Sequence, residues 1–274
     1  MGLTSSLIGG VISSLIAVAI VEIYRVARKK ATLRSLRQLL SNARRVGIAM
    51  PDFPLVVDDR TGSLLSLHDA IALAHVLEAS ARIGAETVIT STSSLPDDLP
   101  RVLICIGGPY SNETTKTQLA SYCPGFHSIG NSYTQGFASG GRKFLEDEDN
   151  SWAYIARLSI DVTEREGEII LLWGSTALAT ATAAYYFAKE SKKLTDIGHS
   201  SIFVALSVNR HLGYRSIPAK PVDITSTALA SKAHPGLTLL FLSSIMIRSG
   251  GGLLASCIGS RYDRAAQGSH RLGL

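Results

Sequence analysis

Short apolar or β-branched runs alternate with amphipathic segments between residues 47 and 225. Runs of this length are typical of strands, and several of the segments between them carry apolar residues at helical spacing. The predicted strands are Phe53–Val57, Glu86–Ser91, Val102–Ile106, Ala153–Ile160, Glu168–Trp173 and Ile202–Val208. Their alternation with helices predicts a Rossmann-like α/β domain with a mostly parallel sheet.

Two connections depart from this alternation. A short polar loop joins Ala153–Ile160 to the strand that begins at Glu168, so we expect an antiparallel hairpin within the sheet. Residues 124–151 lack periodicity and are rich in glycine and serine, which predicts a loop. The acidic run Glu146–Asp149 inside it is interpreted as solvated.

One helix carries clear signals at both ends. Ser66 and Asp69 have the spacing of a capping box, and Gly84 is suited to end the helix. Before this helix, Arg60–Gly62 predicts a turn that follows the first strand.

Two strands run into glycine-rich corners that lead into helices. Gly174 follows one strand and precedes an alanine-rich helical pattern, while Gly107 and Gly108 follow another strand and precede the helical pattern Lys116–Tyr122. Free N–H groups and the dipole at a helix start favour an anion, and parallel sheets bind ligands beyond the carboxyl ends of their strands. The predicted ligand-binding residues are Gly107, Gly108, Asn112, Thr114, Thr115, Gly174, Ser175 and Thr176. The alternative for the first corner is a turn that serine, asparagine and threonine side chains only cap.

The chain begins with an uncharged apolar run from Leu3 to Val21. A helix of this length is about 28 Å long, close to the thickness of the hydrocarbon core of a bilayer. A cleaved secretory signal requires a basic start, which the sequence MGLTSS lacks, and a buried helix of a soluble protein is the third alternative. The run predicts a single transmembrane anchor over residues 1–24.

A basic segment follows the apolar run. Between Glu22 and Asp52 there are eight basic residues and no acidic one. They are Arg25, Arg28, Lys29, Lys30, Arg34, Arg37, Arg44 and Arg45. The positive-inside rule then predicts a single-pass protein of the cell inner membrane, with its N-terminus outside and its main domain in the cytoplasm. Without these eight residues the formal net charge of +5 becomes −3, so the basic balance does not indicate nucleic-acid binding.

Residues 25–46 have the pattern of a juxtamembrane helix with one apolar side. Its leucines are Leu33, Leu36, Leu39 and Leu40. The helix is suited to lie along anionic lipid headgroups through residues 25–45, or to pack its leucine stripe against the domain. In the anchor, Ser5, Gly9, Ser13 and Ala17 repeat every four residues, which favours self-association of two such helices.

Composition agrees with a membrane-associated protein of a reducing compartment. Apolar residues make up 46% of the 274 residues and charged residues only 18%, which is more apolar than a typical soluble protein. The three cysteines show neither metal-binding nor redox spacing. After the α/β domain of residues 47–225, residues 226–274 are predicted to be a C-terminal extension that is partly disordered.

Candidate catalytic residues are few. Asp58 and Asp59 end the first predicted strand, where catalytic acids often lie, and Glu113 is in the first glycine-rich corner. His68 next to Asp69 is a combination found in metal-dependent phosphohydrolases, but helix capping accounts for Asp69, so no metal site is predicted. A G-x-S-x-G motif is absent from the sequence, and the residues do not assign a reaction.

The two corners resemble those of a group of uncharacterised bacterial membrane-anchored proteins with a Rossmann-like domain. The loop GGP-x-x-N-x-x-T is matched by Gly107-Gly108-Pro109, Asn112 and Thr115, and a later helix start is matched by Gly174 and Thr180. The first loop is also similar to that of nucleoside deoxyribosyltransferases and related nucleotide-sensing domains, which carry it near their start. The resemblance covers residues 53–225 and implies the fold more than an activity.

These patterns lead to two hypotheses of different class. In the first, a membrane-anchored cytoplasmic domain binds a nucleotide-like or other anionic small molecule and either senses or processes it. In the second, the chain is a non-catalytic, membrane-tethered interaction or scaffold module that uses its anchor and leucine stripe to assemble partners.

Overall fold

The computed structural model describes residues 2–51, 53–57, 60–91, 100–129, 136–162, 165–216 and 221–230. Only the backbone is described for residues 2–17, 53–57, 60–64, 161–162 and 165–166. The chain divides into two compact units, Met1–Lys232 and Ala233–Leu274. The second unit, and with it most of the predicted C-terminal extension, lies outside the described residues.

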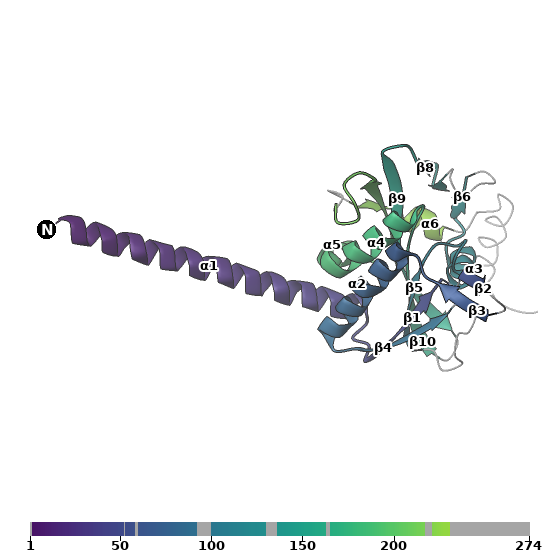
Figure 1. The fold of residues 1–274 in the computed structure, drawn as a ribbon, viewed down its shortest axis with the longest axis horizontal. Helices are drawn as coiled ribbons and strands as arrows, with labels where there is room; N and C mark the ends of the chain where they lie inside the picture. Colours follow the sequence, from purple (N-terminus) through teal and green to yellow (C-terminus); the bar gives the residue numbers. More distant parts are fainter. Residues whose placement is uncertain are drawn as a thin grey trace, which may run out of the picture. The chain divides into compact units, whose positions relative to one another are not determined.

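A seven-stranded sheet forms the centre of the first unit (Figure 1). Its strands, in spatial order, are β12 (Val222–Asp223), β11 (Ile202–Asn209), β9 (Asn150–Val162), β10 (Arg165–Gly174), β5 (Val102–Ile106), β1 (Arg45–Met50) and β4 (Glu86–Ser91). Neighbours from β10 to β4 pair in parallel, whereas β9 pairs antiparallel with both β10 and β11, and β12 pairs antiparallel with β11. The predicted α/β class and the antiparallel β9–β10 hairpin are confirmed, and the arrangement is consistent with a Rossmann-like fold.

Both faces of the sheet are covered (Figure 1). One face packs against α2 (Leu67–Ile83), α4 (Ala177–Lys189), the end of α1 (Gly2–Leu39) and the short α5 (Ser191–Thr195). The other face carries α3 (Glu113–Tyr122), α6 (Thr225–Leu229) and a small sheet. Each face of the sheet therefore has its own hydrophobic core, and alternate residues of a strand point into one or the other. In β5, Ile104 and Ile106 lie in the first core, with α2 and α4, and Leu103 and Cys105 lie in the second core, with α3.

The predicted ends of α2 are confirmed. The Oγ atom of Ser66 accepts a hydrogen bond from the backbone N–H of Asp69 at 3.1 Å, and Gly84 ends the helix with φ of +77°. Local sequence decides these ends, because each depends on residues within one helical turn.

The first predicted strand forms, but it does not belong to the central sheet. Phe53–Val57 is strand β2, but it pairs antiparallel with β3 (Arg60–Leu64) in a separate two-stranded sheet. Arg60–Gly62, predicted as a turn, belongs to β3. The first strand of the central sheet along the chain is β1, which begins inside the basic segment. It pairs in parallel with β5 on one side and β4 on the other, and all its residues after Arg45 are buried.

The loop predicted for residues 124–151 contains a three-stranded antiparallel sheet. Its strands are β6 (Phe126–Ser128), β7 (Phe137–Ser139) and β8 (Arg142–Phe144). Each strand has three residues, too few to show an alternating pattern, and each buries one phenylalanine in the second core. The acidic run is solvated over Asp147–Asp149, but Glu146 is mostly buried and forms an ion pair with Arg210.

The leucine stripe of α1 packs on the domain. Leu36, Leu39 and Leu40 are at most 2% exposed and belong to the first core. Of the two interpretations of residues 31–45, the one in which the stripe contacts the domain is confirmed. The basic side chains of the segment stay exposed, so contact with anionic lipids through them stays a prediction.

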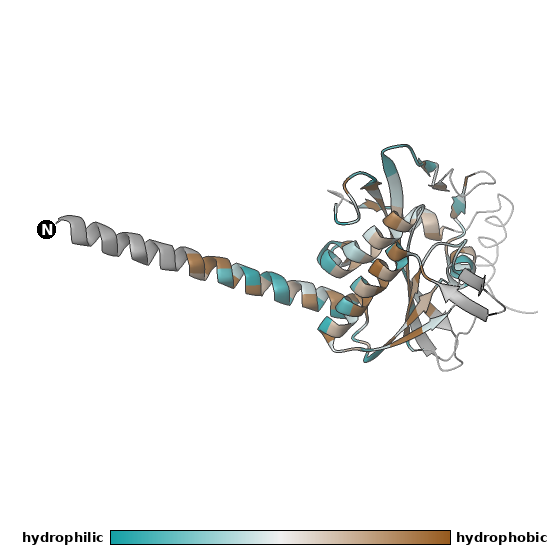
Figure 2. Ribbon diagram, in the orientation of Figure 1, coloured by the Kyte–Doolittle hydropathy of each residue, from teal (hydrophilic) through white to brown (hydrophobic). Residues whose placement is uncertain are grey.

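Along the described part of α1, the side chains change from apolar to charged (Figure 2). Val18, Ile20, Val21, Ile23 and Tyr24 are each about half or more exposed. Among the residues described with their side chains, no helix is long and apolar enough to cross a membrane. The predicted span of residues 3–21 and its small-residue repeat lie largely outside those residues.

We expect Leu36→Ala to lower the free energy of unfolding by about 2–5 kcal/mol, because it leaves a cavity at a position with 0% exposure. Urea unfolding of the full chain in a neutral detergent, followed by the fluorescence of its two tryptophans, measures this change. The neighbouring exposed Arg37→Ala is the control and should change stability by less than about 0.5 kcal/mol. Equal, small effects of both substitutions would show that the stripe does not pack in the core.

Candidate functional site

The two glycine-rich corners lie side by side at one edge of the sheet. β5 and β10 are parallel neighbours, with Ile106 opposite Leu172, so both strands end at the same edge. The N–H of Gly107 donates a hydrogen bond to the carbonyl of Leu172 at 3.0 Å. A Cβ added to Gly108 would lie 3.7 Å from the carbonyl oxygen of Gly174, so the two backbones are in close proximity.

The helices that follow the two corners leave the edge in opposite directions. α3 packs in the second core through Leu119, and α4 packs in the first core through Ala179 and Ala183 (Figure 1). Adjacent parallel strands whose helices diverge in this way leave a crevice beyond their carboxyl ends. Ligands of open α/β sheets bind at this kind of crevice.

The side chains of the first corner hold the corner itself together. The Asn112 amide donates to the carbonyls of Ile106 at 2.7 Å and Ala49 at 3.3 Å, and its Oδ1 atom accepts from the N–H of Thr115 at 2.9 Å. The Oγ1 atom of Thr115 donates to the carbonyl of Gly107 at 3.0 Å, and Gly107 has φ of +99°. Asn112, Thr114 and Thr115 are buried, so these contacts support the interpretation of a capped turn.

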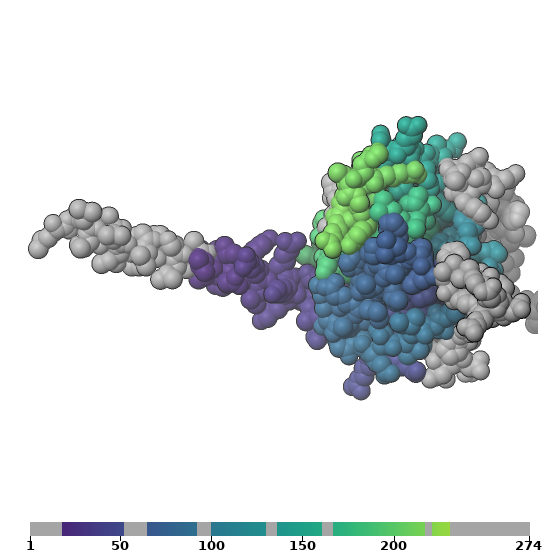
Figure 3. Space-filling model, viewed as in Figure 1, coloured from purple at the N-terminus to yellow at the C-terminus, as the bar shows by residue number. Residues whose placement is uncertain are grey.

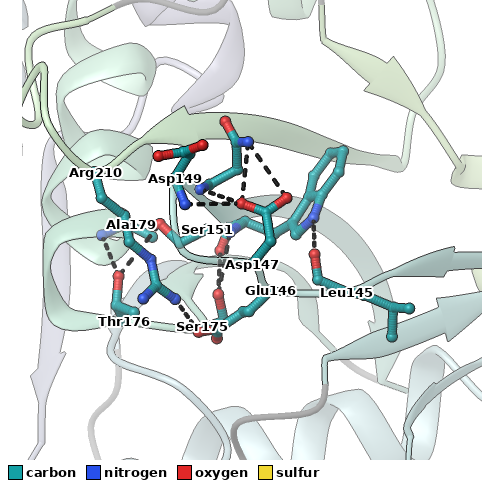
Figure 4. Close-up of polar contacts among 11 residues, drawn as sticks. Leu145, Glu146, Asp147, Asp149, Ser151, Ser175, Thr176, Ala179 and Arg210 are labelled. Atoms are coloured by element: carbon teal, nitrogen blue, oxygen red, sulfur yellow. Dashed lines mark hydrogen bonds and ion pairs between the residues drawn. The ribbon is translucent and has the colours of Figure 1, made fainter.

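The second corner is built in a similar way. Thr176 caps α4 by accepting a hydrogen bond from the N–H of Ala179 at 3.2 Å (Figure 4). Thr180 accepts one from the N–H of Gly174 at 3.1 Å. The hydroxyl of Ser175 accepts a hydrogen bond from the N–H of Trp152 at 3.1 Å, which ties the corner to β9. A Cβ added to Gly174 would lie 2.3 Å from the Cβ of Ala179. Close packing of α4 on the end of β10 therefore requires glycine at this position.

A polar cluster borders the second corner, where β9 begins and β11 ends (Figure 4). Arg210 forms an ion pair with Glu146, and His211 contacts Asp149 at 3.1 Å. Hydrogen bonds from the backbone N–H groups of Asn150 and Asp149 lower the pKa of the Asp147 carboxyl. The sequence did not predict this cluster, because its members come together only through the pairing of β9 with β11.

An aromatic cluster lies beneath the first corner. The rings of Tyr154 and Trp173 stack with centroids 5.1 Å apart, and both side chains are 0% exposed. Neither the Tyr154 hydroxyl nor the Trp173 indole N–H has a hydrogen-bond partner among the described residues. Burial raises the pKa of Tyr154, so its hydroxyl stays protonated. The Cδ1 atom of Trp173, which is bonded to the indole nitrogen, lies 3.5 Å from the position of a Cβ on Gly108.

Of the candidate catalytic residues, Glu113 lies within the described part of the chain. Glu113 is exposed in the first turn of α3 and pairs with Lys116 at 3.0 Å. Asp58 and Asp59 lie outside the described residues. Asp69 is buried at the start of α2, where its carboxylate accepts a hydrogen bond from the Ser66 hydroxyl at 2.6 Å, and burial raises its pKa.

Both cysteines in the described part of the chain are buried. Burial raises the pKa values of Cys105 and Cys123 to about 12, so both thiols stay protonated and are poor nucleophiles. No group of three or more histidine, cysteine or acidic side chains among the described residues is placed to hold a metal ion.

Comparison with protein-family models, curated proteins and solved structures finds no match to this chain. The function proposed below therefore rests on the geometry of the described residues and on the sequence.

We expect Gly174→Ala to lower the free energy of unfolding by about 1–3 kcal/mol, because the added methyl group overlaps Ala179 and the backbone of α4. Gly167→Ala in the same strand is the control: its Cβ would meet nothing closer than 3.6 Å, and its effect should stay below about 1 kcal/mol. Thermal and urea unfolding of both variants measure the difference. A neutral Gly174→Ala would show that the close approach of α4 is incorrect.

We expect Asn112→Ala to lower the free energy of unfolding by roughly 2–4 kcal/mol, because it removes a helix cap and leaves the buried carbonyl of Ile106 without its 2.7 Å donor. Ser111→Ala removes a single 3.3 Å hydrogen bond at a half-buried position and should cost less than about 1 kcal/mol. Parallel urea titrations compare the two variants. If Asn112→Ala is as stable as Ser111→Ala, the side chain of Asn112 has a role other than holding the corner.

Proposed function

We propose that the chain is a membrane-anchored protein whose cytoplasmic α/β domain binds an anionic small molecule in the crevice between the ends of β5 and β10. A nucleotide or another phosphate compound is the ligand class that this proposal favours. The first turns of α3 and α4, which follow the glycine corners, would contact it through those backbone N–H groups that the caps leave free. The proposal includes no catalytic step.

One observation carries the proposal. β5 and β10 are adjacent and parallel, and the helices that follow them, α3 and α4, pack on opposite faces of the sheet. The first turns of both helices are therefore directed at one crevice, where their unpaired N–H groups and dipoles attract negative charge.

The membrane part of the proposal rests on the sequence. The uncharged run Leu3–Val21 has the length of a membrane span, and the basic residues after it favour a cytoplasmic domain. The basic side chains of residues 25–45 are exposed, and those nearest to the anchor, Arg25 and Arg28, would then contact anionic headgroups.

We expect a phosphate compound from a panel of pyrophosphate, ADP, ATP and NAD to raise the melting temperature of the full chain in a neutral detergent. At a concentration of 100 times Kd, binding stabilises a protein by about 2.7 kcal/mol. Ala177→Glu, exposed in the first turn of α4, should weaken this binding by about tenfold, because its carboxylate repels an anion at the crevice. An acidic residue in the first turn of a helix is itself favourable, so the variant should fold.

The matched control is Ala74→Glu, which makes the same charge change at an exposed position of α2. It should leave the affinity unchanged. Absence of stabilisation by every compound, or equal losses in both variants, would contradict the proposal and favour the interaction-module hypothesis.

A further inference from the structure

A hollow runs along one side of α1, where this helix joins the domain. It is lined by Lys30, Leu33, Arg34, Arg37, Gln38, Ser41 and Asn42. These residues recur at spacings of three and four, so they share one side of the helix and the turn that follows it. The described part of α1 to which they belong is drawn in purple in Figure 3. The hollow lies at the end of α1 that meets the domain and does not include the crevice between β5 and β10.

The positive charge in this hollow is not compensated. Within the described part of the chain, Lys30, Arg34 and Arg37 form no ion pair, and all three side chains are exposed. Other arginines of the same structure are paired, such as Arg157 with Glu168 and Arg210 with Glu146. Three unpaired cations on one side of a helix repel each other, and an anion that bridges them would remove this repulsion.

The turn at the end of the hollow has an unusual backbone. Ser41 and Asn42 have φ of 47° and 53°, and they are the non-glycine residues with positive φ among those the structure describes. Such conformations carry a free-energy cost and tend to occur at functional sites. Here they reverse the chain after α1, so that the side chains of both residues line the same hollow as Arg37.

A second, smaller hollow of about 210 Å³ adjoins the first and shares Gln38 with it. Its other lining residues include Arg157, Thr195, His199 and Ser200. Arg157 is fixed by a two-pronged ion pair with Glu168, at 2.6 and 3.2 Å, and by a 3.4 Å hydrogen bond to the hydroxyl of Ser41. The part of the combined hollow that Arg157 lines is therefore polar and fixed in position, which favours binding of a polar ligand.

We propose that this combined hollow binds a molecule that carries two or more phosphate groups. Lys30 and Arg37 are about 10 Å apart along the helix, which exceeds the reach of a single phosphate. Arginine side chains bind phosphate oxygens with two parallel hydrogen bonds, and asparagine, serine and glutamine add donors around them.

Two sources can supply this chemistry: a soluble polyphosphate compound and the phosphorylated headgroup of a lipid. Along an upright helix, Lys30 and Arg37 lie about 14 and 24 Å beyond Val21. The headgroup layer extends only about 5–8 Å beyond the hydrocarbon core. On an anchored chain the hollow therefore opens to water, and the geometry favours the soluble source.

The test is calorimetric titration of the full chain in a neutral detergent with inorganic tripolyphosphate. About 150 mM salt is used, because it reduces the Debye length to about 8 Å and suppresses non-specific attraction. We expect wild-type protein to bind, and the double variant Arg34→Gln, Arg37→Gln to bind at least about tenfold more weakly. The matched control is Arg28→Gln, Lys29→Gln, which makes the same charge change at exposed positions of α1 outside the hollow. It should stay within about twofold of wild type.

The same titration in micelles that contain phosphatidylinositol bisphosphate separates the two sources. Loss of tripolyphosphate binding would identify the lipid headgroup as the occupant, and unchanged binding would identify a soluble compound. Ala177→Glu should leave unchanged the part of the tripolyphosphate binding that Arg34→Gln, Arg37→Gln removes, which distinguishes this hollow from the crevice between β5 and β10. Absence of binding to wild type in neutral micelles, or equal weakening in both double variants, would overturn the proposal.

Discussion

The burial of β5 and β10 on both faces is the constraint on which the rest of the structure depends. All five residues of β5 are buried, and its side chains alternate between the two cores. Each fully buried aliphatic side chain contributes about 1.5–3 kcal/mol, so the central strands need a layer of helices or strands on each side. α2 and α4 cover one side, and α3 with the β6–β8 sheet covers the other. The crevice proposed between the ends of β5 and β10 would follow from the same packing, because these two neighbouring strands send their helices to different layers.

The glycines and polar side chains of the two corners make this packing possible. Gly174 allows α4 to approach the end of β10, and Asn112 holds the end of β5 and the start of α3 together. The geometry of a strand-to-helix turn is therefore enough to explain why glycine, asparagine and threonine occur at these two corners. What the corners offer a ligand is their backbone, since the side chains of Asn112 and Thr115 are already bonded.

The other end of the sheet is tied to α1. Arg157 of β9 binds Glu168 of β10, the hydroxyl of Ser41 and the carbonyl of Ser200. One guanidinium therefore joins the turn after α1 to β9, to the first half of β10 and to the residues before β11. A mostly buried ion pair contributes little net stability, but it fixes the relative position of the elements that it joins. In this chain it fixes where the basic side of α1 lies with respect to the sheet.

Local signals decided much of what could be predicted. The ends of α2, the strands β4, β5, β10 and β11, and the β9–β10 hairpin were all correct, since each depends on residues close together in sequence. β1 was missed because it begins with Arg45 inside a basic segment that has a helical pattern. The strands β6, β7 and β8 were missed because three residues carry no readable period.

The amino-acid sequence by itself determined the α/β class, the two glycine-rich corners and the charge asymmetry near the N-terminus, because composition and short-range periodicity contain them. Only the tertiary structure decided that β2 leaves the central sheet, that the leucines of α1 face the domain, and that Glu146 meets Arg210 across 64 positions. Such contacts depend on which strands pair and which faces are covered. Strand pairing and the covering of sheet faces depend on how apolar residues from many segments are buried together, so no single segment of the sequence determines them.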